Sequence, residues 1–276
     1  MTTNNQRFSF EFFPPKTDAG REKLEQTWQQ LEQLNPAFYS VTYGAGGSTR
    51  DNTFGIVKKM KSQGLSVAPH LSFGGDDETS MAALLDDYKA LGVDRIVALR
   101  GDIPSGMGAA RVVYANELVS FIRRHSDDHF HLEVAAYPEI HPESKSYLTD
   151  IDFLKKKLDA GANSAITQYF FTADAYFYFV EACQKAGIDK PIYPGIMPIT
   201  NFANLRRFSV GCGAEIPQWL QRRLEAYGDD QQAIAAFGEE VIIRLCQQLL
   251  AGGAPGLHFY TMNQLEPTQS IYQAVV

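Results

Sequence analysis

Polar and charged side chains stand within or just after short β-rich runs at several places in this 276-residue chain. Glu11 interrupts the run FSFEFF, His70 lies near the end of SVAPHL, and Arg100 closes RIVALR. A carboxyl group and an imidazole can move protons, and a guanidinium binds anions. Other runs end in or near Thr42, Tyr43, Asp102, Tyr137, Glu139, His141 and Gln168. These residues would form a reaction centre if the ends of the runs meet in space.

Glu11 is the most informative of these residues because Phe8, Phe10, Phe12 and Phe13 surround it in the sequence. Apolar surroundings raise the pKa of a carboxyl group, since burial disfavours the charged form. The pattern therefore predicts a glutamate held protonated near neutral pH, as a general acid requires. The alternative is an outward-facing or salt-bridged strand residue.

Eight β-rich runs alternate with segments of helical pattern, such as REKLEQTWQQLEQL and DDETSMAALLDDYKAL. We expect strands at 8–13, 38–43, 66–71, 95–100, 131–137, 164–170, 192–197 and 256–262. Eight βα units predict an α/β protein of one domain, a (β/α)8 TIM barrel over residues 1–276, with its active site at the C-terminal ends of the strands. A doubly wound sheet would need fewer strands or a second domain.

The segment between the seventh and eighth expected strands is longer than one helix requires. We expect an extra helix there, PQWLQRRLEAY at 217–227, near the mouth of the barrel. No linker, low-complexity segment or internal repeat divides the chain, which agrees with a single domain.

Composition limits the classes of partner. The formal net charge of -7 argues against a nucleic-acid surface, and no apolar run reaches the roughly 18 residues of a membrane span. The N-terminus has no apolar core of a signal peptide, so we expect a cytoplasmic protein. The three cysteines lie far apart and suit buried residues of a reducing compartment. Because H-E-x-x-H and C-x-x-C are absent, we expect no metal.

Two local motifs are ambiguous by themselves. TYGAGGSTRD (42–51) follows an expected strand, but it matches neither glycine-rich phosphate-binding fingerprint and could be a simple mobile loop. The run KKK (155–157) could be a solvated helix face or could meet an anion.

Taken together, the strand-end motifs resemble the methylenetetrahydrofolate reductases, of the short bacterial type that is a catalytic barrel without a regulatory domain. The resemblance covers the whole chain in order, through FSFEFFPPKT, VTYGAGGSTRD, APHL, IVALRGD, VAAYPEIHPE, DAGANSAITQYFF, YPGIMPI and HFYTMN. It implies an FAD-binding barrel that reduces 5,10-methylenetetrahydrofolate to 5-methyltetrahydrofolate with NADH or NADPH. It further implies a ping-pong cycle through FAD, supply of methyl groups for methionine synthesis, and a homo-oligomer.

The resemblance also implies roles for single residues. Glu11 would be the general acid that protonates a folate nitrogen as the methylene bridge opens, and Asp102 would lie beside the flavin and the pterin. Lys156 and Lys157 would meet the diphosphate of FAD. The implied FAD contacts are Thr42, Tyr43, Ala45, His70, Arg100, Gly101, Asp102, Tyr114, Ala115, Ala135, Tyr137, His141, Asp150, Lys156, Lys157 and Ile166.

For the substrate, Asp102 and Gln168 would contact folate, and Phe208 would stack on folate or nicotinamide in turn. Three positions depart from the family pattern. Asn204 and Gln264 stand where relatives tend to carry Gln and Arg, and Phe153 stands where a polar residue is common. Asn204 and Gln264 would also contact the substrate. Because both depart from the family pattern, the affinity of the protein for the glutamate tail of folate stays open.

Two other functions remain open on the sequence alone. A flavin barrel of the proline-dehydrogenase kind would share the architecture but oxidise an amine, and a non-catalytic folate or flavin carrier would bind without turnover. The choice between NADH and NADPH is also open, because no Rossmann acidic residue is identifiable.

Overall fold

The computed structural model describes residues 6–43, 47–73, 77–101 and 113–276, with only the backbone at 47–49. Ala45 and Asp102, two of the predicted site residues, lie outside these ranges.

Eight parallel strands form a closed barrel in chain order, and the first strand pairs with the last. This confirms the predicted TIM barrel. The strands are β1 (Arg7–Phe12), β2 (Phe38–Val41), β3 (Val67–Leu71), β4 (Arg95–Ala98), β5 (His131–Ala136), β6 (Ser164–Tyr169), β7 (Ile192–Ile196) and β8 (Gly256–Tyr260).

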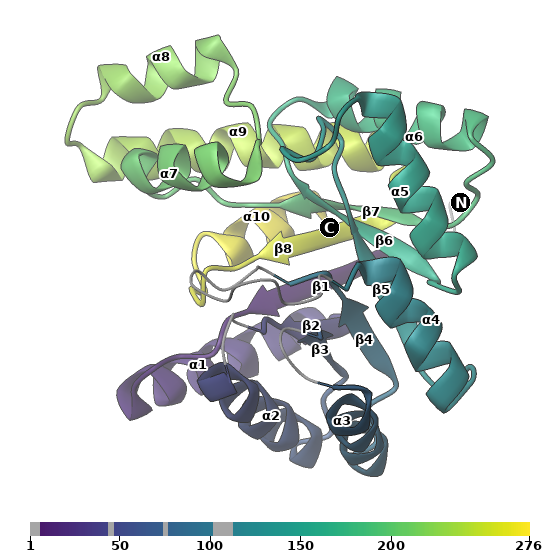
Figure 1. Ribbon diagram of the computed structural model, residues 1–276. Coiled ribbons are helices and arrows are strands. Elements are labelled where there is room, and N and C mark those ends of the chain that lie inside the picture. The colour runs from purple at the N-terminus through teal and green to yellow at the C-terminus, as the bar shows by residue number, and fades with distance from the viewer. Residues whose placement is uncertain (1–5, 44–46, 74–76, 102–112) are drawn as a thin grey trace, which may run out of the picture.

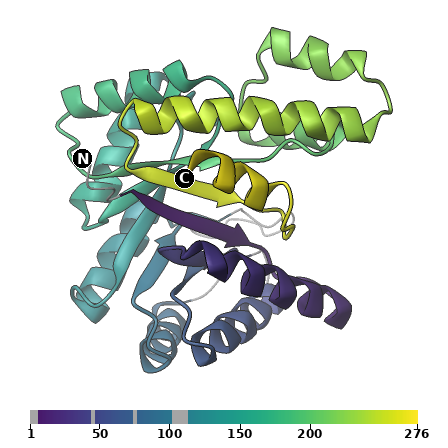
Figure 2. The same cartoon turned by 180° about the vertical axis from the view of Figure 1, so that it is seen from behind.

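Helices surround the barrel (Figures 1 and 2). The ring consists of α1 (Asp18–Leu31), α2 (Gly47–Ser62), α3 (Glu78–Ala90), α4 (Ala115–Ser126), α5 (Tyr147–Asp159), α6 (Ala173–Lys185), α9 (Gln231–Ala251) and α10 (Thr268–Val275). A short 3-10 helix, η1 (Glu32–Leu34), follows α1. Several helices begin at a side chain that accepts a hydrogen bond from a backbone N–H of the first turn, as Thr17 does before α1, Asp77 before α3 and Asp230 before α9.

Two further helices, α7 (Phe202–Cys212) and α8 (Gln218–Ala226), lie between β7 and α9. Figures 1 and 2 show this pair projecting beyond one end of the barrel. The predicted extra helix is α8. The same segment also holds α7. Of its three helices, α9 is the ring helix that packs against β7, and α7 and α8 are additional.

Strand alternation divides the apolar side chains between two cores. Phe8, Phe10 and Phe12 of β1 join the large core between the strands and the helices, where Phe10 stacks on Phe259 with 5.6 Å between ring centroids. A second, smaller cluster is separate from it and consists of Phe38, Ala68, Val97 and Ile166. These four residues come from the opposite face of their strands and therefore fill the inside of the barrel.

A buried ionic group lies inside the barrel near the N-terminal ends of its strands. Glu133 of β5 is fully buried and accepts hydrogen bonds from Arg95 of β4 and Ser164 of β6. His131 lies 3.2 Å from the same carboxylate. The guanidinium of Arg95 also covers the ring of Phe38, 4.5 Å from its centroid. This group, Arg95, His131, Glu133 and Ser164, is called the base cluster below.

Candidate active site

The carboxylate of Glu11 lies inside the barrel among polar side chains from three other strands. Its Oε2 accepts a hydrogen bond from Ser40 Oγ at 3.3 Å, and it lies 3.1 Å from His70 Nε2 and 3.3 Å from His258 Nε2. The His70 contact has ion-pair distance, but it lacks the alignment of a hydrogen bond. Ser9 Oγ lies 2.7 Å from Nδ1 of His258 and orients that ring.

These neighbours overturn the predicted protonation of Glu11. Burial by itself raises the pKa of Glu11, but the charge of His70 at ion-pair distance and the hydrogen bond with His258 bring the pKa down to about 2. The reasoning from Phe8, Phe10 and Phe12 was wrong because neighbours along a strand point to the opposite face.

His258 is a site residue that the sequence analysis missed. Its side chain is fully buried, and it approaches Glu11 only because β8 closes the barrel against β1. A signal was present in the run GLHFYTM, where Leu257 and Phe259 alternate with His258 and Tyr260. With the apolar pair facing the helices, the alternation puts the polar pair inside the barrel.

Tyr260 and Gly195 shape the wall beside this centre. The Tyr260 hydroxyl donates to the Thr167 carbonyl at 2.7 Å, and the Gly195 N–H donates to the hydroxyl of Thr167 at 2.9 Å. A Cβ at Gly195 would lie 2.1 Å from the Thr167 carbonyl oxygen and 2.7 Å from Cε2 of Tyr260. Only glycine fits at this position.

A second group of predicted residues lies after β4 and β5. Arg100 forms a two-pronged ion pair with Glu143, in which Nη2 donates to Oε1 at 3.0 Å. The rings of Tyr137 and His141 meet edge to face, with centroids 4.6 Å apart. The backbone N–H of His141 donates to Asp150 of α5 at 2.8 Å. The structure therefore brings these predicted FAD contacts together.

The lysine run on α5 serves two different purposes. Lys155 pairs with Asp159 on the exposed face of the helix, as the solvated-face interpretation expects. Lys157 instead donates to the carbonyl of Ala135, and burial lowers its pKa to about 8 against the opposing charge of Asp150. Lys157 therefore carries a positive charge at neutral pH while it lies against the end of β5.

Lys156 is exposed and lies 5.0 Å from the ring centroid of Phe153, which is itself exposed. Phe153 thus offers an aromatic partner for a cation. Both side chains remain accessible to a ligand.

The remaining predicted FAD contacts line the same end of the barrel or begin the next helix. Thr42 follows β2 and binds Thr53 of α2 through its carbonyl oxygen. Gly101 has φ +78° and leaves no room for a side chain beside Ser72. Ile166 lies in the interior cluster. Tyr43 follows Thr42 after β2, and Tyr114 and Ala115 begin α4.

The predicted substrate contacts are separate from one another in the chain. Gln168 is partly buried near the end of β6, and its Oε1 accepts from the N–H of Tyr169. Phe208 is exposed on α7 under the guanidinium of Arg207, 5.1 Å from the ring centroid. The exposed ring is unlike a core phenylalanine. Asn204 on α7 and Gln264 after β8 are also exposed.

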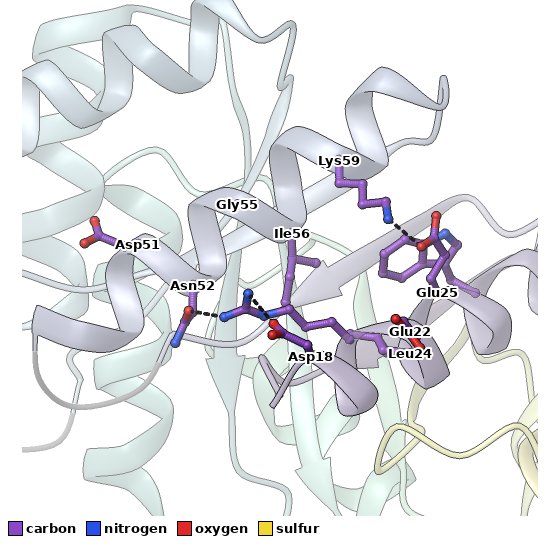
Figure 3. Close-up of a pocket in the computed structure, with 11 residues that line it drawn as sticks. Asp18, Glu22, Leu24, Glu25, Asp51, Asn52, Gly55, Ile56 and Lys59 are labelled. Atoms are coloured by element: carbon purple, nitrogen blue, oxygen red, sulfur yellow. Dashed lines mark hydrogen bonds and ion pairs between the residues drawn. The ribbon is translucent and has the colours of Figure 1, made fainter. Parts of the chain in front are cut away.

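A crevice of about 410 Å³ lies elsewhere, between α1 and α2 (Figure 3). Arg21 binds Asp18 of the same helix and reaches across the crevice to Asn52, and Lys59 of α2 binds Glu25 of α1. None of the predicted site residues lines it, so this crevice is a seam between two ring helices. Over the parts of the chain that the structure describes, no three His, Cys, Asp or Glu side chains gather as a metal site would require. No helix in those parts is both long and apolar enough for a membrane span.

Comparison with known proteins places this geometry in a family. The family model described as methylenetetrahydrofolate reductase matches residues 1–276. The chain belongs to the methylenetetrahydrofolate reductase family. It is similar to the 5,10-methylenetetrahydrofolate reductase of Escherichia coli K12, with 40% identity over 264 residues that cover 95% of this chain and 88% of that protein.

A further relative and a solved structure extend the comparison. Methylenetetrahydrofolate reductase (NADH) 1 of Arabidopsis thaliana is 38% identical over 271 residues, which cover 93% of this chain but 46% of that protein. A solved structure from Clostridium thermocellum is described as an uncharacterized protein that binds two copies of 5-methyl-5,6,7,8-tetrahydrofolic acid. It shares the fold with a TM-score of 0.66 at 16% identity, and the match covers 98% of this chain and 94% of that chain. The resemblance seen in the motifs is confirmed, and membership in the methylenetetrahydrofolate reductase family supports reduction of methylenetetrahydrofolate.

Proposed function

We propose that this reductase converts 5,10-methylenetetrahydrofolate to 5-methyltetrahydrofolate with FAD and either NADH or NADPH, and that Glu11 is its general acid. The observation that carries the proposal is a carboxylate held between two imidazoles inside the barrel of a methylenetetrahydrofolate reductase family member. The product would supply methyl groups for methionine synthesis.

The described residues fit FAD. A dinucleotide needs cations for its diphosphate, and Lys157, Lys156 and Arg100 supply them around the ends of β4 and β5. Ala135 and Ile166 offer small or apolar surface on the inside of the barrel, where a flat ring system can lie. When bound, FAD supplies a carrier that takes a hydride from NAD(P)H and gives it to the folate, which makes the cycle ping-pong.

The proton that opens the methylene bridge is the part that this chain supplies. Glu11 is ionised at neutral pH between the two imidazoles, because its pKa is about 2. In our proposal His70 or His258 returns a proton to the carboxylate, and Glu11 passes it to the folate nitrogen. Ser9 and Ser40 hold the two ends of this route in place through their hydrogen bonds. Asp102 is proposed to oppose a cationic folate with its negative charge.

The first test is the visible spectrum of the purified protein, followed by anaerobic titration with NADH, NADPH and methylenetetrahydrofolate. We expect a bound flavin that is bleached by one of the two nicotinamides and recoloured by the folate. A colourless protein that cannot be loaded with FAD would contradict the proposal. Turnover of proline without turnover of the folate would indicate a flavin barrel of the proline-dehydrogenase kind. Bound flavin without oxidation of NAD(P)H by menadione would indicate a non-catalytic carrier.

The role of Glu11 has its own test. Glu11→Gln should slow the reduction of methylenetetrahydrofolate by about 10²- to 10⁴-fold, because a positioned general acid contributes about that much. Oxidation of NAD(P)H with menadione as acceptor should stay near the wild-type rate, since it needs no such proton. Stopped-flow measurement of each half-reaction checks both statements. Equal slowing of the two half-reactions would exclude the acid role.

We also propose that the protein works in the cytoplasm as a homo-oligomer. The family resemblance supports the oligomer, and the cysteines support a reducing compartment because Cys183, Cys212 and Cys246 are all free. Light scattering at several protein concentrations tests the oligomer, and fractionation of cells tests the location.

A further inference from the structure

Three contacts attach the projecting helix α7 to the end of the barrel. Glu139, in the loop between β5 and α5, accepts a hydrogen bond from the backbone N–H of Glu215 at 2.7 Å. Tyr169 at the end of β6 shares a hydrogen bond with Ser209 at 3.1 Å and accepts one from the thiol of Cys212 at 3.3 Å. The third contact is steric and lies at Gly213, where α7 ends.

Gly213 has φ +77° and packs directly on the β5–α5 loop. A Cβ there would lie 2.8 Å from Cγ of Pro142. The loop and the end of α7 are therefore in close contact beside the Glu139 hydrogen bond. The next helix, α8, begins only after Pro217, so the Glu215 N–H belongs to no helix and needs an outside acceptor.

The β5–α5 loop is itself strained and tied to the second group of site residues. Ile140 has φ +142°, a region that β-branched residues rarely adopt. On one side of it Glu139 holds the α7–α8 connection, and on the other side His141 is held by Asp150 of α5. Such strain persists only where the surroundings fix the backbone on both sides.

We propose that Glu139 is a positioning residue that fixes the end of α7, and with it Phe208, relative to the residues around His141. Phe208 lies one turn before Cys212 on the same short helix, so a movement of its C-terminal end moves the exposed ring. Glu139 is 76 residues from Glu215 in the chain and acts through the Glu215 backbone N–H, without a role in the chemistry itself. This proposal rests on the proposed function for the meaning of Phe208.

The kinetic test uses Glu139→Ala, Glu139→Gln and Glu215→Ala in the complete enzyme. Glu139→Ala should raise KM for methylenetetrahydrofolate on the order of tenfold with a smaller change in kcat, since the acceptor that holds the Glu215 N–H is lost. Glu139→Gln should stay close to wild type, because an amide oxygen accepts the same bond. Glu215→Ala is the matched control, because it removes a side chain and keeps the N–H that donates.

Hydrogen exchange measured by mass spectrometry tests the contact without any assay of turnover. Peptides covering 209–217 should exchange faster in Glu139→Ala than in wild type, Glu139→Gln and Glu215→Ala. Faster exchange together with an unchanged KM would overturn the positioning role, and unchanged exchange would overturn the contact itself. Equal damage from Glu139→Gln and Glu139→Ala would also overturn the proposal. If wild type does not turn over the folate, the proposed function fails while the exchange result still decides whether Glu139 holds α7.

Discussion

Glu11 lies where two opposed electrostatic effects meet. Its side chain is 17% exposed, so water stabilises the carboxylate poorly. Two imidazoles compensate for this loss, and the lower pKa depends on them rather than on the apolar residues of β1. The balance can be changed from either side by single substitutions.

His258→Ala should raise the pKa of Glu11 above its value of about 2, because burial continues to act while one lowering contact is lost. Titration of carboxyl-labelled glutamate by NMR measures the change, and Glu11→Gln identifies the resonance. Ser126→Ala is the control, since Ser126 is a buried serine at the C-terminal end of α4 and its loss leaves Ser9, His70 and His258 in place. An unchanged pKa in His258→Ala would show that the ring does not stabilise the charge of Glu11.

The difference between expectation and structure at Glu11 has a simple physical origin. That a carboxylate stands inside an apolar strand run was readable from the sequence. Its protonation was not, because the decisive neighbours Ser40, His70 and His258 belong to three other strands. Proton affinity depends on contacts that exist only in the closed barrel.

At the scale of elements, the strands were predictable because each is a short apolar run bounded by turn residues. The expected strand 164–170 became β6 (Ser164–Tyr169), and the expected strand 256–262 became β8 (Gly256–Tyr260). The expected ends ran slightly too far, since the apolar pattern continues past the last ladder partner. The attachment of α7 to the β5–α5 loop was not predictable, because a carboxylate that binds a backbone N–H leaves no pattern in the sequence.

The meeting of β6, β7 and β8 gives a prediction about one element. Gly195→Ala should lower the free energy of unfolding by about 1–3 kcal/mol or more, because the added methyl group overlaps the Thr167 carbonyl. Urea unfolding measures it. Gly55→Ala is the control on α2, where a Cβ meets nothing within 4 Å. There the change should be neutral or stabilising by about 0.5–1 kcal/mol. Equal stability of the two variants would contradict the crowding described at Gly195.

For the whole molecule, the base cluster is a stabilising feature at the end of the barrel away from the proposed chemistry. Glu133 is fully buried, and burial raises its pKa, while His131, Arg95 and Ser164 lower it by more. A carboxyl group whose pKa is lowered by folding stabilises the fold at pH values above its ordinary pKa of 4.5. This stabilisation is lost as the pH falls below 4.5 towards the lowered pKa.

Glu133→Gln should therefore destabilise the protein by about 3 kcal/mol at neutral pH, since it leaves Arg95 with no charged partner in a site that water hardly reaches. The difference from wild type should shrink as the pH is lowered below 4.5. Chemical unfolding at several pH values measures both effects. Glu240→Gln is the control, because its pair with Arg244 is exposed and should contribute less than about 0.5 kcal/mol. A pH-independent difference would argue against an ionised Glu133.

The pairing of β1 with β8 also bears on how the protein is made. During synthesis the ribosome delivers Glu11 well before His258, which emerges only after seven strands have been translated. Until then the first strand has an unpaired edge, and its carboxylate lacks one imidazole. The cluster of Glu11 and its two imidazoles is therefore completed only when β8 closes the barrel, and a nascent chain stopped before β8 would lack it however well its earlier βα units had formed.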